Sequence, residues 1–597
     1  MKKSELKENH YKICRPHETV DRITDILQKS KIVVEEKAKH RSSIYTNSLR
    51  LVIKGTDIGT NGKGVTVSYA AASAYAEFME RLENQHLNSY ARIPEKHDAG
   101  FFLFPDEKVM QIDELLSQKD AFWNCLINHY DIPLDVIRKI RFLDFDRTNQ
   151  AGAYISLPFW DYADNRCVYL PYSLYRPWYG SNGMCAGNSP EEALVQGMSE
   201  IFERIAMKRI FSEKGPLPDI PEKYIMKYPQ IYRRFQNITK NNRYIARMID
   251  CSFGGELPVA GLLVIEKNTG NFGLKLGCHP DFGIAMERSL TEASQGQDVF
   301  DFSRSSYLDF ANEDVFSELN MANCFMTGNG QYPYQFFGNE SKFSFCEPED
   351  VSEKDNRELL AGMIVKIQDM GYHVLIRDVS FMGFPAYHII VPGLSETGNV
   401  TMEDYDMIYK LNHSVALFRN PQLINETTAE ELMMVMQHYS YRQYLSFFMH
   451  TEDVKHIPFE NIGESVHFYQ AAVSIASGDY TEGIKFLTLI SQKLGGFSGQ
   501  EEEKNWLLAL VYYLSARQEL EDHDKIMAYL RRFFDDPLCL RLDKLFGIKN
   551  TLPFDSKLFC KLVAAYKENE IDMQVQEMMN NARTAMAKTV LVQQRIL

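Results

Sequence analysis

The chain lacks closely spaced cysteines, a basic excess and any long apolar run. Its ten cysteines are scattered with no pair at CxxC spacing, which excludes the pattern of a zinc knuckle, an iron–sulfur site or a thioredoxin-type centre. A net charge of −15 argues against binding nucleic acid through phosphate neutralisation. No run of about 18 apolar residues is present, and no apolar stretch follows the charged N-terminus. The sequence therefore predicts a cytoplasmic protein without a membrane segment or a direct nucleic-acid partner.

The chain is too long for one hydrophobic core, so 597 residues predict two or more domains. Residues 1–420 mix strand-like and helix-like patterns, and residues 421–597 are helix-like almost throughout. We expect an α/β (α+β) domain followed by an all-α domain. Residues 471–484 resemble the turn of a tetratricopeptide-type helix pair, although two such pairs are fewer than a solenoid needs. The helical domain is expected to pack on the main domain or on a partner chain.

Three segments of the first domain follow a common order of strands, a turn and a helix. The expected elements are a helix at 18–40, strands at 43–56 and 65–69 around a glycine-rich loop at 59–64, a helix at 68–83, a second glycine-rich turn at 180–188, a helix at 190–211, strands at 244–250, 258–266 and 272–277, and a helix ending near 297. Ligands often bind at helix N-termini that follow such turns.

A short charged pattern occurs twice in the expected helices, and a related one occurs once more. The segments are Glu77-Phe-Met-Glu80-Arg81, Glu200-Ile-Phe-Glu203-Arg204 and Arg288-Ser-Leu-Thr-Glu292. A Glu–Arg pair at this spacing is commonly a solvated surface pair, contributing about 0.2–0.5 kcal/mol to a helix. The preceding glycine-rich turns and the neighbouring Ala and Gly residues favour a packed site instead. We expect the five glutamates to converge into one carboxylate-lined pocket edged by arginines.

The chemistry of such a pocket suits a hard cation that bridges to phosphate. The segment Gly62-Lys63-Gly64 looks like the end of a P-loop, but that motif requires Gly at position 57 and Ser or Thr at position 64, where the chain has Asp and Gly. Glutamates repel phosphate unless Mg²⁺ lies between them, and arginine grips phosphate oxygens directly. The sequence therefore predicts a magnesium and phosphate site without a P-loop.

Other reactive side chains have simpler explanations. His279, in Gly-Cys-His-Pro-Asp, is either a general base or a turn residue before a helix, and we favour the turn residue. Cys185 and Cys278 are expected to be small buried residues.

These motifs together resemble the split signature of the YcaO family. The matching elements are Ser73-x3-Glu77-x2-Glu80-Arg81, then Asn188-x3-Glu192-x3-Gln196-x2-Ser199-Glu200-x2-Glu203-Arg204, then Arg288-x3-Glu292-x2-Gln295, with further agreement at Asn61-Gly-Lys-Gly, Ser181-Asn-Gly-Met and His279-Pro-Asp-Phe-Gly. The resemblance covers roughly residues 10 to 415. It implies a YcaO-type ATP-binding fold over residues 1–420, followed by a tetratricopeptide-like helical domain over residues 421–597.

The resemblance implies ATP and Mg²⁺ as cofactors and assigns roles to residues of this sequence. The implied magnesium ligands are Glu77, Glu80, Glu200, Glu203 and Glu292. The implied nucleotide contacts are Asn188, Glu192, Arg204 and Arg288, with Ser73, Arg81 and Gln196 from the same motifs and with Lys12 and Thr19 at the spacing of a family Lys and Ser. Arg204, Arg288 and Glu292 are the residues expected to act on the transferring phosphoryl group.

Members of this family use ATP to activate a backbone amide of a peptide or protein. Azoline-forming members commonly end in a proline-rich tail, whereas the last proline here is Pro553, which counts against ring formation. The helical C-terminal part resembles stand-alone bacterial members. Those are homodimers described as accessory factors for β-methylthiolation of a small-subunit ribosomal protein, beside a radical-SAM methylthiotransferase. Two alternatives stay open: a nucleotide-regulated scaffold acting through its helical domain, and a cyclodehydratase or thioamidation enzyme of peptide natural products.

Overall fold

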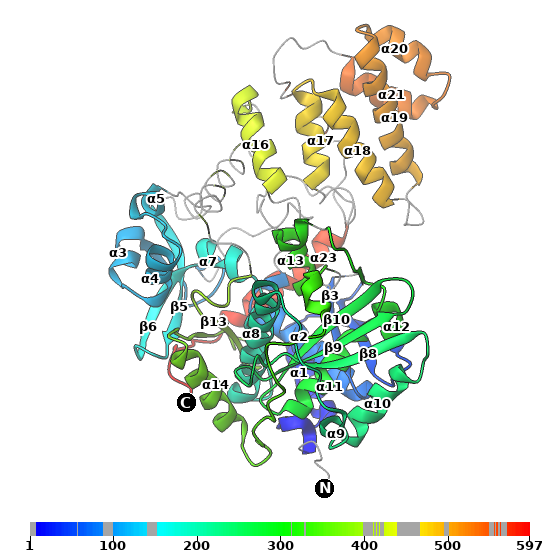
Figure 1. Ribbon diagram of the computed structural model, residues 1–597. Coiled ribbons are helices and arrows are strands. Elements are labelled where there is room, and N and C mark those ends of the chain that lie inside the picture. Colours follow the sequence, from blue (N-terminus) through cyan, green and yellow to red (C-terminus); the bar gives the residue numbers. More distant parts are fainter. Residues whose placement is uncertain are drawn as a thin grey trace.

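The computed structural model describes most of the chain as a strand-bearing body with a group of helices beside it (Figure 1). The described residues are 8–56, 58–87, 100–139, 152–311, 313–326, 330–397, 423–438, 466–494, 501–547 and 570–597, with a few single positions at 401–417 and 555–562. Within this part of the chain, no helix combines the length and apolar character that a bilayer crossing needs.

Three sheets form the strand-bearing body, and all strand pairs that the structure describes are antiparallel. The first sheet contains, in order across the sheet, β1 (Val34–Arg41), β2 (Asn47–Ile53) and β3 (Gly59–Gly64). The second contains β4 (Lys108–Gln111), β5 (Ala153–Asp161), β12 (Leu375–Asp378), β13 (Ala386–Ile390) and β7 (Met184–Ala186), and β6 (Arg166–Pro171) pairs with β5. The third contains β11 (Ser306–Tyr307), β10 (Asn271–Cys278), β9 (Val259–Glu266) and β8 (Tyr244–Asp250). This arrangement confirms the predicted α+β class.

Three longer helices carry the charged patterns, and a polar side chain caps the first turn of each. They are α2 (Val67–Glu83), capped by Thr66, α8 (Pro190–Glu213), capped by Ser189, and α11 (Phe282–Ala293), capped by Asp281. Each cap accepts a hydrogen bond from a backbone N–H of that first turn, for example from Glu192 N to Ser189 Oγ at 3.2 Å. The caps explain where the three helices begin: α2 and α8 start within one residue of the predicted positions, whereas α11, expected to run to about 297, ends at Ala293.

Each of these helices is anchored in a different hydrophobic cluster. Phe78 and Leu82 of α2 are buried in one cluster, Met198 and Phe202 of α8 in a second, and Leu290 of α11 in a third. Because the apolar faces point into three separate cores, the polar faces are left to meet one another.

The remaining helices of the body connect and cover these elements. They are α1 (Pro16–Lys29), η1 (Glu8–Tyr11), α3 (Ile112–Ser117), α4 (Ala121–Asn124), η3 (Cys125–His129), α5 (Leu134–Lys139), α7 (Tyr172–Tyr179), α9 (Glu222–Ile225), α10 (Pro229–Thr239), α12 (Val299–Phe302), η4 (Glu313–Phe316), α13 (Glu318–Met326), η5 (Tyr334–Phe337) and α14 (Asn356–Asp369).

Three local predictions near the N-terminus are wrong, one of them the strand expected at 65–69, where helix α2 begins at Val67. The helix expected at 18–40 ends at Lys29, and residues 34–41 form strand β1, which pairs with β2 at the edge of the first sheet. Charged side chains are typical of such edge strands. The glycine-rich loop expected at 59–64 is strand β3, which lies directly on α2: a Cβ atom at Gly62 would lie only 2.1 Å from the backbone oxygen of Ala70.

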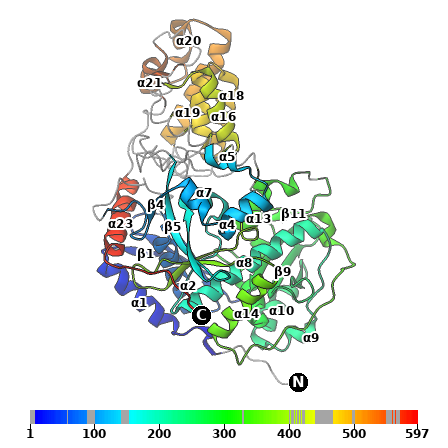
Figure 2. The ribbon, with the colours of Figure 1, turned by 90° about the vertical axis from the view of Figure 1, so that its left-hand side faces the viewer.

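The C-terminal part is helical, as predicted, and most of it has a hydrophobic cluster of its own. Its helices are α16 (Glu426–His438), α17 (Val466–Ala476), α18 (Tyr480–Leu494), α19 (Glu501–Glu519), α20 (His523–Leu530), α21 (Asp536–Phe546) and α23 (Glu570–Met586). Figures 1 and 2 show α16–α21 gathered away from the sheets. The tetratricopeptide-like character of this region stays a prediction.

The last helix and the residues after it return to the strand-bearing body (Figure 2). Met579 and Met586 of α23 are buried in the same cluster as Phe78 of α2. Beyond α23, the Gln593 side chain accepts a hydrogen bond from Asp378 N and donates one to Asp378 O, at 2.7 and 2.9 Å. The domain boundary at 420 stays a prediction, and residues 570–597 pack with the core of residues 1–420.

Candidate functional site

The structure brings together the five glutamates that the sequence singled out, from α2, α8 and α11. We call Glu77, Glu80, Glu200, Glu203 and Glu292 the glutamate cluster. Their carboxyl groups act on one another electrostatically: Glu200 and Glu292 both raise the pKa of Glu77, and Glu292 and Glu200 raise that of Glu203. The polar faces of the three helices therefore meet at one place.

The surroundings of two members of the glutamate cluster disfavour the charged form of their carboxyl groups. Burial, followed by repulsion from Glu292, raises the pKa of Glu203 from its ordinary value to about 7. Burial also raises the pKa of Glu80 well above its ordinary range, with Glu200 and Glu77 adding to the effect against the opposing charge of Arg81. Such carboxyl groups gain from a further cation.

Two arginines and a lysine lie within the cluster. Arg81 Nε is 3.4 Å from Glu80 Oε1, and Arg204 NH2 is 3.5 Å from Glu200 Oε1. Lys63 Nζ forms an ion pair with Glu292. Burial alone would raise the pKa of Glu292, but the ammonium groups of Lys63 and Lys275 outweigh it and lower that pKa.

Sequence reasoning gave no site role to either lysine. Lys63 belongs to the segment that we set aside as a failed P-loop, and Lys275 lies in a strand with ordinary alternation. Two signals mark Lys63, the Gly62-Lys63-Gly64 pattern and the family resemblance at Asn61-Gly-Lys-Gly, whereas none marks Lys275.

The donor set of the cluster fits magnesium. All five side chains offer carboxylate oxygens, the ligands that Mg²⁺ prefers in proteins, and magnesium sites typically combine carboxylates with substrate phosphates. Burial, followed by neighbouring carboxylates, raises the pKa of Glu80 and Glu203, and a bound cation would favour the charged form of both groups. The glutamate cluster could therefore hold Mg²⁺, with Arg81 and Arg204 beside it.

A second group of predicted residues meets at the other end of α8. Glu192 Oε1 lies 3.3 Å from Lys12 Nζ and accepts a hydrogen bond from Asn188 Nδ2 at 3.1 Å. Asn188 Oδ1 accepts one from Thr19 Oγ1 at 3.1 Å, and the backbone N–H of Ile13 donates to Glu192 Oε2 at 2.9 Å. Although burial acts in the other direction, Lys12 and these backbone groups lower the pKa of Glu192. The N-terminal segment is thus fastened to the start of α8.

Gln196 and Arg288 lie between the two groups. Arg288 NH1 donates to Cys278 O at 2.7 Å, and its NH2 donates to Gln196 Oε1. Ser73 is half-buried on α2, one turn before Glu77. With a rise of 1.5 Å per residue, Glu192 and Glu203 are about 17 Å apart along α8. The predicted residues therefore follow α8 from its start to its middle, with Lys12, Thr19, Asn188 and Glu192 near the start and the glutamate cluster further along.

His279 and the two cysteines have structural surroundings. His279 Nδ1 accepts a hydrogen bond from Asp281 N at 3.0 Å, within the turn that begins α11. Burial, with the nearby charges of Arg288 and Lys12, lowers the pKa of His279 well below its ordinary value. This geometry suits the turn residue that the sequence favoured. Cys185 and Cys278 are buried, as expected.

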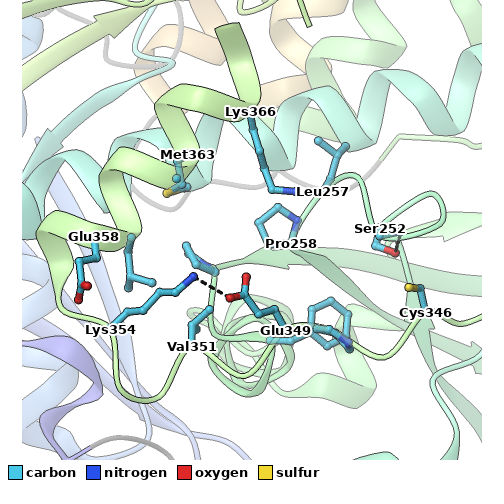
Figure 3. A pocket seen from close by; sticks show the side chains of 16 residues that line it. Ser252, Leu257, Pro258, Cys346, Glu349, Val351, Lys354, Glu358, Met363 and Lys366 are labelled. Atoms are coloured by element: carbon cyan, nitrogen blue, oxygen red, sulfur yellow. Dashed lines mark hydrogen bonds and ion pairs between the residues drawn. The ribbon is translucent and has the colours of Figure 1, made fainter. Parts of the chain in front are cut away.

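A separate cavity of about 160 Å³ lies beside α14 (Figure 3). Leu257, Met363 and Val351 contribute apolar surface, and Lys354 Nζ pairs with Glu349 Oε1 at 2.8 Å. Tyr11 donates a hydrogen bond at 2.9 Å to the backbone oxygen of Val351, one of the lining residues. No member of the glutamate cluster lines this cavity, so it is distinct from the candidate site.

Comparison with known proteins defines the class of this chain as an ATP- and Mg²⁺-binding protein. A family described as "YcaO cyclodehydratase, ATP- and Mg²⁺-binding" matches residues 61–395, more than half of the chain. The chain belongs to the YcaO family. ATP and Mg²⁺, the cofactors expected from the sequence, are those of the family.

Two curated relatives match over similar lengths. The chain is 31% identical over 340 residues to the ribosomal protein S12 methylthiotransferase accessory factor YcaO of Escherichia coli (strain K12), covering 56% of this chain and 57% of that protein. It is 29% identical over 341 residues to an uncharacterised protein of Haemophilus influenzae, again covering 56% and 57%. The chain thus matches little more than half the length of these relatives.

Solved structures resemble the chain more distantly. YcaO from Methanopyrus kandleri, bound with AMPPCP and Mg²⁺, has a TM-score of 0.39 at 16% identity over 64% of this chain and 92% of that chain. A heterocyclase in complex with substrate and cofactor has a TM-score of 0.46 at 18% identity over 66% and 54%. At these scores the similarity sets no correspondence between individual residues.

Proposed function

We propose that this chain uses ATP and Mg²⁺ to activate a backbone amide of a peptide or protein. The observation that carries the proposal is the glutamate cluster, in which three helices bring buried and half-buried carboxyl groups together beside arginines. Bound Mg·ATP would supply the phosphoryl group that turns an amide oxygen into a good leaving group.

In this proposal the two ends of the site have different tasks. Lys12, Thr19, Asn188 and Glu192 bind the nucleotide, because their linked polar groups lie together at the start of α8. The glutamate cluster holds magnesium at the other end.

The arginines of the proposed site are held in defined positions. Arg288 is fixed by Cys278 O and by Gln196, and Arg204 by Glu200 and the backbone oxygen of Phe325. Guanidinium groups placed in advance stabilise the negative charge that develops during phosphoryl transfer. We therefore assign Arg204 and Arg288 to charge stabilisation, and Glu292 to the same step through the magnesium ion that it would hold.

We further propose that the chain is an accessory factor for β-methylthiolation of a small-subunit ribosomal protein. The printed name of the Escherichia coli relative supports this assignment. The chain has no cysteine pair at CxxC spacing, so a radical-SAM methylthiotransferase would perform the radical step. A cytoplasmic homodimer completes the proposal.

Two variants of the site test the enzymatic proposal. Glu200→Gln and Arg288→Ala are each expected to abolish ATP turnover and to weaken Mg·AMPPCP binding measured by calorimetry, because each removes a charge from the proposed site. Glu213→Gln, on the same helix but paired only with Arg209 in the described structure, is the matched control. Wild-type ATP turnover in both site variants would show that the site is misassigned.

Mass spectrometry of ribosomal proteins tests the proposed substrate. Cells that lack this chain should contain less of the methylthiolated small-subunit protein than cells that have it. If that protein is modified equally in both and another peptide carries an azoline or thioamide, the alternative of a natural-product enzyme is correct.

A nucleotide-regulated scaffold is the second candidate, favoured by the surface of the helical region. Tyr529 and Phe533 are 58% and 74% exposed beside α20, and Tyr512 of α19 is 51% exposed. Exposed aromatic side chains are typical of binding surfaces. This function predicts that Tyr529→Ser with Phe533→Ser abolishes partner capture while ATP turnover is unchanged. Retained capture in the double variant would exclude it.

A further inference from the structure

The position of Lys63 is set by the two glycines beside it. A Cβ atom at Gly62 would lie 2.1 Å from Ala70 O, and one at Gly64 would lie 2.7 Å from Ala70 N. Only glycine permits so close an approach of strand β3 to helix α2. Because the strand lies directly on the helix, the Lys63 side chain starts beside α2 and reaches across to α11.

Two contacts fasten Lys63 to the end of α11. Its ammonium pairs with Glu292 and lies 3.5 Å from Gln295 Oε1, while Gln295 Nε2 donates to Asn61 O at 2.7 Å. The charge of Lys63 also acts on Glu77 and Glu203, which come from α2 and α8. Lys63 thus places a positive charge among carboxylates of all three helices.

The arginines of the cluster are placed differently. Arg81 pairs with Glu77 and Glu80 of its own helix, and Arg204 pairs with Glu200 of its own helix. Lys63 comes from a strand, and it bridges to a carboxylate that a neighbouring helix supplies. A lysine is a compact point charge on a flexible stem, so it can change partners by rotating its side chain.

We propose, on the basis of the proposed function, that Lys63 makes magnesium and nucleotide bind as one cooperative unit. Without metal, the ammonium of Lys63 neutralises Glu292. If Glu292 held Mg²⁺, the ion pair of Lys63 with Glu292 would weaken, and the ammonium would gain by pairing with another anion close by. A nucleotide phosphate provides that partner. Each ligand therefore strengthens the binding of the other, by the same factor in both directions.

This coupling makes two predictions of opposite sign for Lys63→Gln. Mn²⁺ alone, followed by its electron paramagnetic resonance signal, should bind the variant about tenfold more tightly than wild type, because Glu292 is already free. Mg·AMPPCP, followed by calorimetry, should bind about tenfold more weakly, because the phosphate loses its ammonium partner. A purely structural role of Lys63 would not strengthen metal binding.

Matched variants separate this role from general effects of charge or folding. Lys39→Gln removes an exposed ammonium that pairs with Glu36 on β1 of the same sheet, and both affinities should stay at the wild-type value. Lys63→Arg keeps the positive charge and should restore the weak binding of Mn²⁺ alone. Circular dichroism melts establish that each variant is folded.

The outcomes distinguish the two proposals. If wild type binds no Mg·AMPPCP, the proposed function is wrong, and the coupling role falls with it. If wild type binds it but Lys63→Gln shifts both affinities in the same direction, or shifts neither, only the role of Lys63 is wrong. Opposite shifts in Lys63→Gln with none in Lys39→Gln establish the coupling.

Discussion

The pKa of Glu203 predicts how the stability of the metal-free protein depends on pH. Glutamate in an unfolded chain titrates near pH 4.5, whereas burial and Glu292 raise the pKa of folded Glu203 to about 7. The folded state therefore holds the proton of the Glu203 carboxyl group more tightly than the unfolded state does. The stabilisation that this proton gives to the fold is fully present below pH 4.5 and is lost as pH rises through 7. The loss amounts to about 3 kcal/mol.

Replacing Glu203 by Gln removes the ionisation and keeps the shape. In the presence of EDTA and without nucleotide, Glu203→Gln should be more stable than wild type by up to about 3 kcal/mol at pH 8 and nearly equal to it at pH 5. Urea unfolding at the two pH values measures the difference. Glu213→Gln, which removes a partly exposed pair with Arg209, should change the free energy of unfolding by no more than about 1 kcal/mol.

The sign of the difference tests the reasoning. If Glu203→Gln is less stable than wild type at pH 8, or if its gain is the same at pH 5, then Glu203 does not carry an unfavourable buried charge. The glutamate cluster would then already be neutralised without a metal.

Three further predictions concern packing and the nucleotide end of the site. Gly62→Ala should lower the free energy of unfolding by about 3 kcal/mol, because the new Cβ atom collides with the backbone of α2. Gly362→Ala on α14, where the added Cβ meets open space, should raise the free energy of unfolding by about 0.5–1 kcal/mol. Urea titration measures both variants, and equal effects would contradict the close contact between β3 and α2. Gln593→Ala should cost about 1–2 kcal/mol, since two hydrogen bonds to a strand backbone are lost, and an unchanged melting curve would show that the C-terminal segment adds no stability. Lys12→Ala should weaken Mg·AMPPCP binding about tenfold in calorimetry, because Glu192 loses its cation, and unaltered affinity would place the nucleotide elsewhere.

The three site helices could be predicted because their signals are local. The turn at 180–188 that precedes α8, and charged residues at spacings of three and four such as Glu200, Glu203 and Arg204, each belong to a single segment and report its structure directly. The repeated spacing of glutamates placed their carboxylates on one face of each helix. The convergence of those faces then followed from the repetition of the pattern.

The parts that sequence reasoning missed depend on contacts between distant segments. Strand β1 carries mostly charged residues, so its pairing with β2, rather than any apolar alternation, makes it a strand. The composition of the segment Gly59–Gly64 predicts a loop, and only its contact with α2 in the structure explains why glycines occupy strand β3. The ion pair of Lys63 with Glu292 joins two segments that no local pattern connects. Likewise, no local pattern predicts that Met579 of α23 packs in the hydrophobic cluster that contains Phe78 of α2.

The central claim is that glutamates of α2, α8 and α11 share divalent metal beside a nucleotide. A crystal of the protein with AMPPCP and Mn²⁺, measured at a wavelength where manganese scatters anomalously, tests it directly. We expect anomalous peaks beside carboxylates of all three helices: Glu77 or Glu80 of α2, Glu200 or Glu203 of α8, and Glu292 of α11. The metal–oxygen distances should be close to those of magnesium, about 2.0–2.1 Å. Peaks that contact only phosphate oxygens, or that lie away from all three helices, would contradict the account.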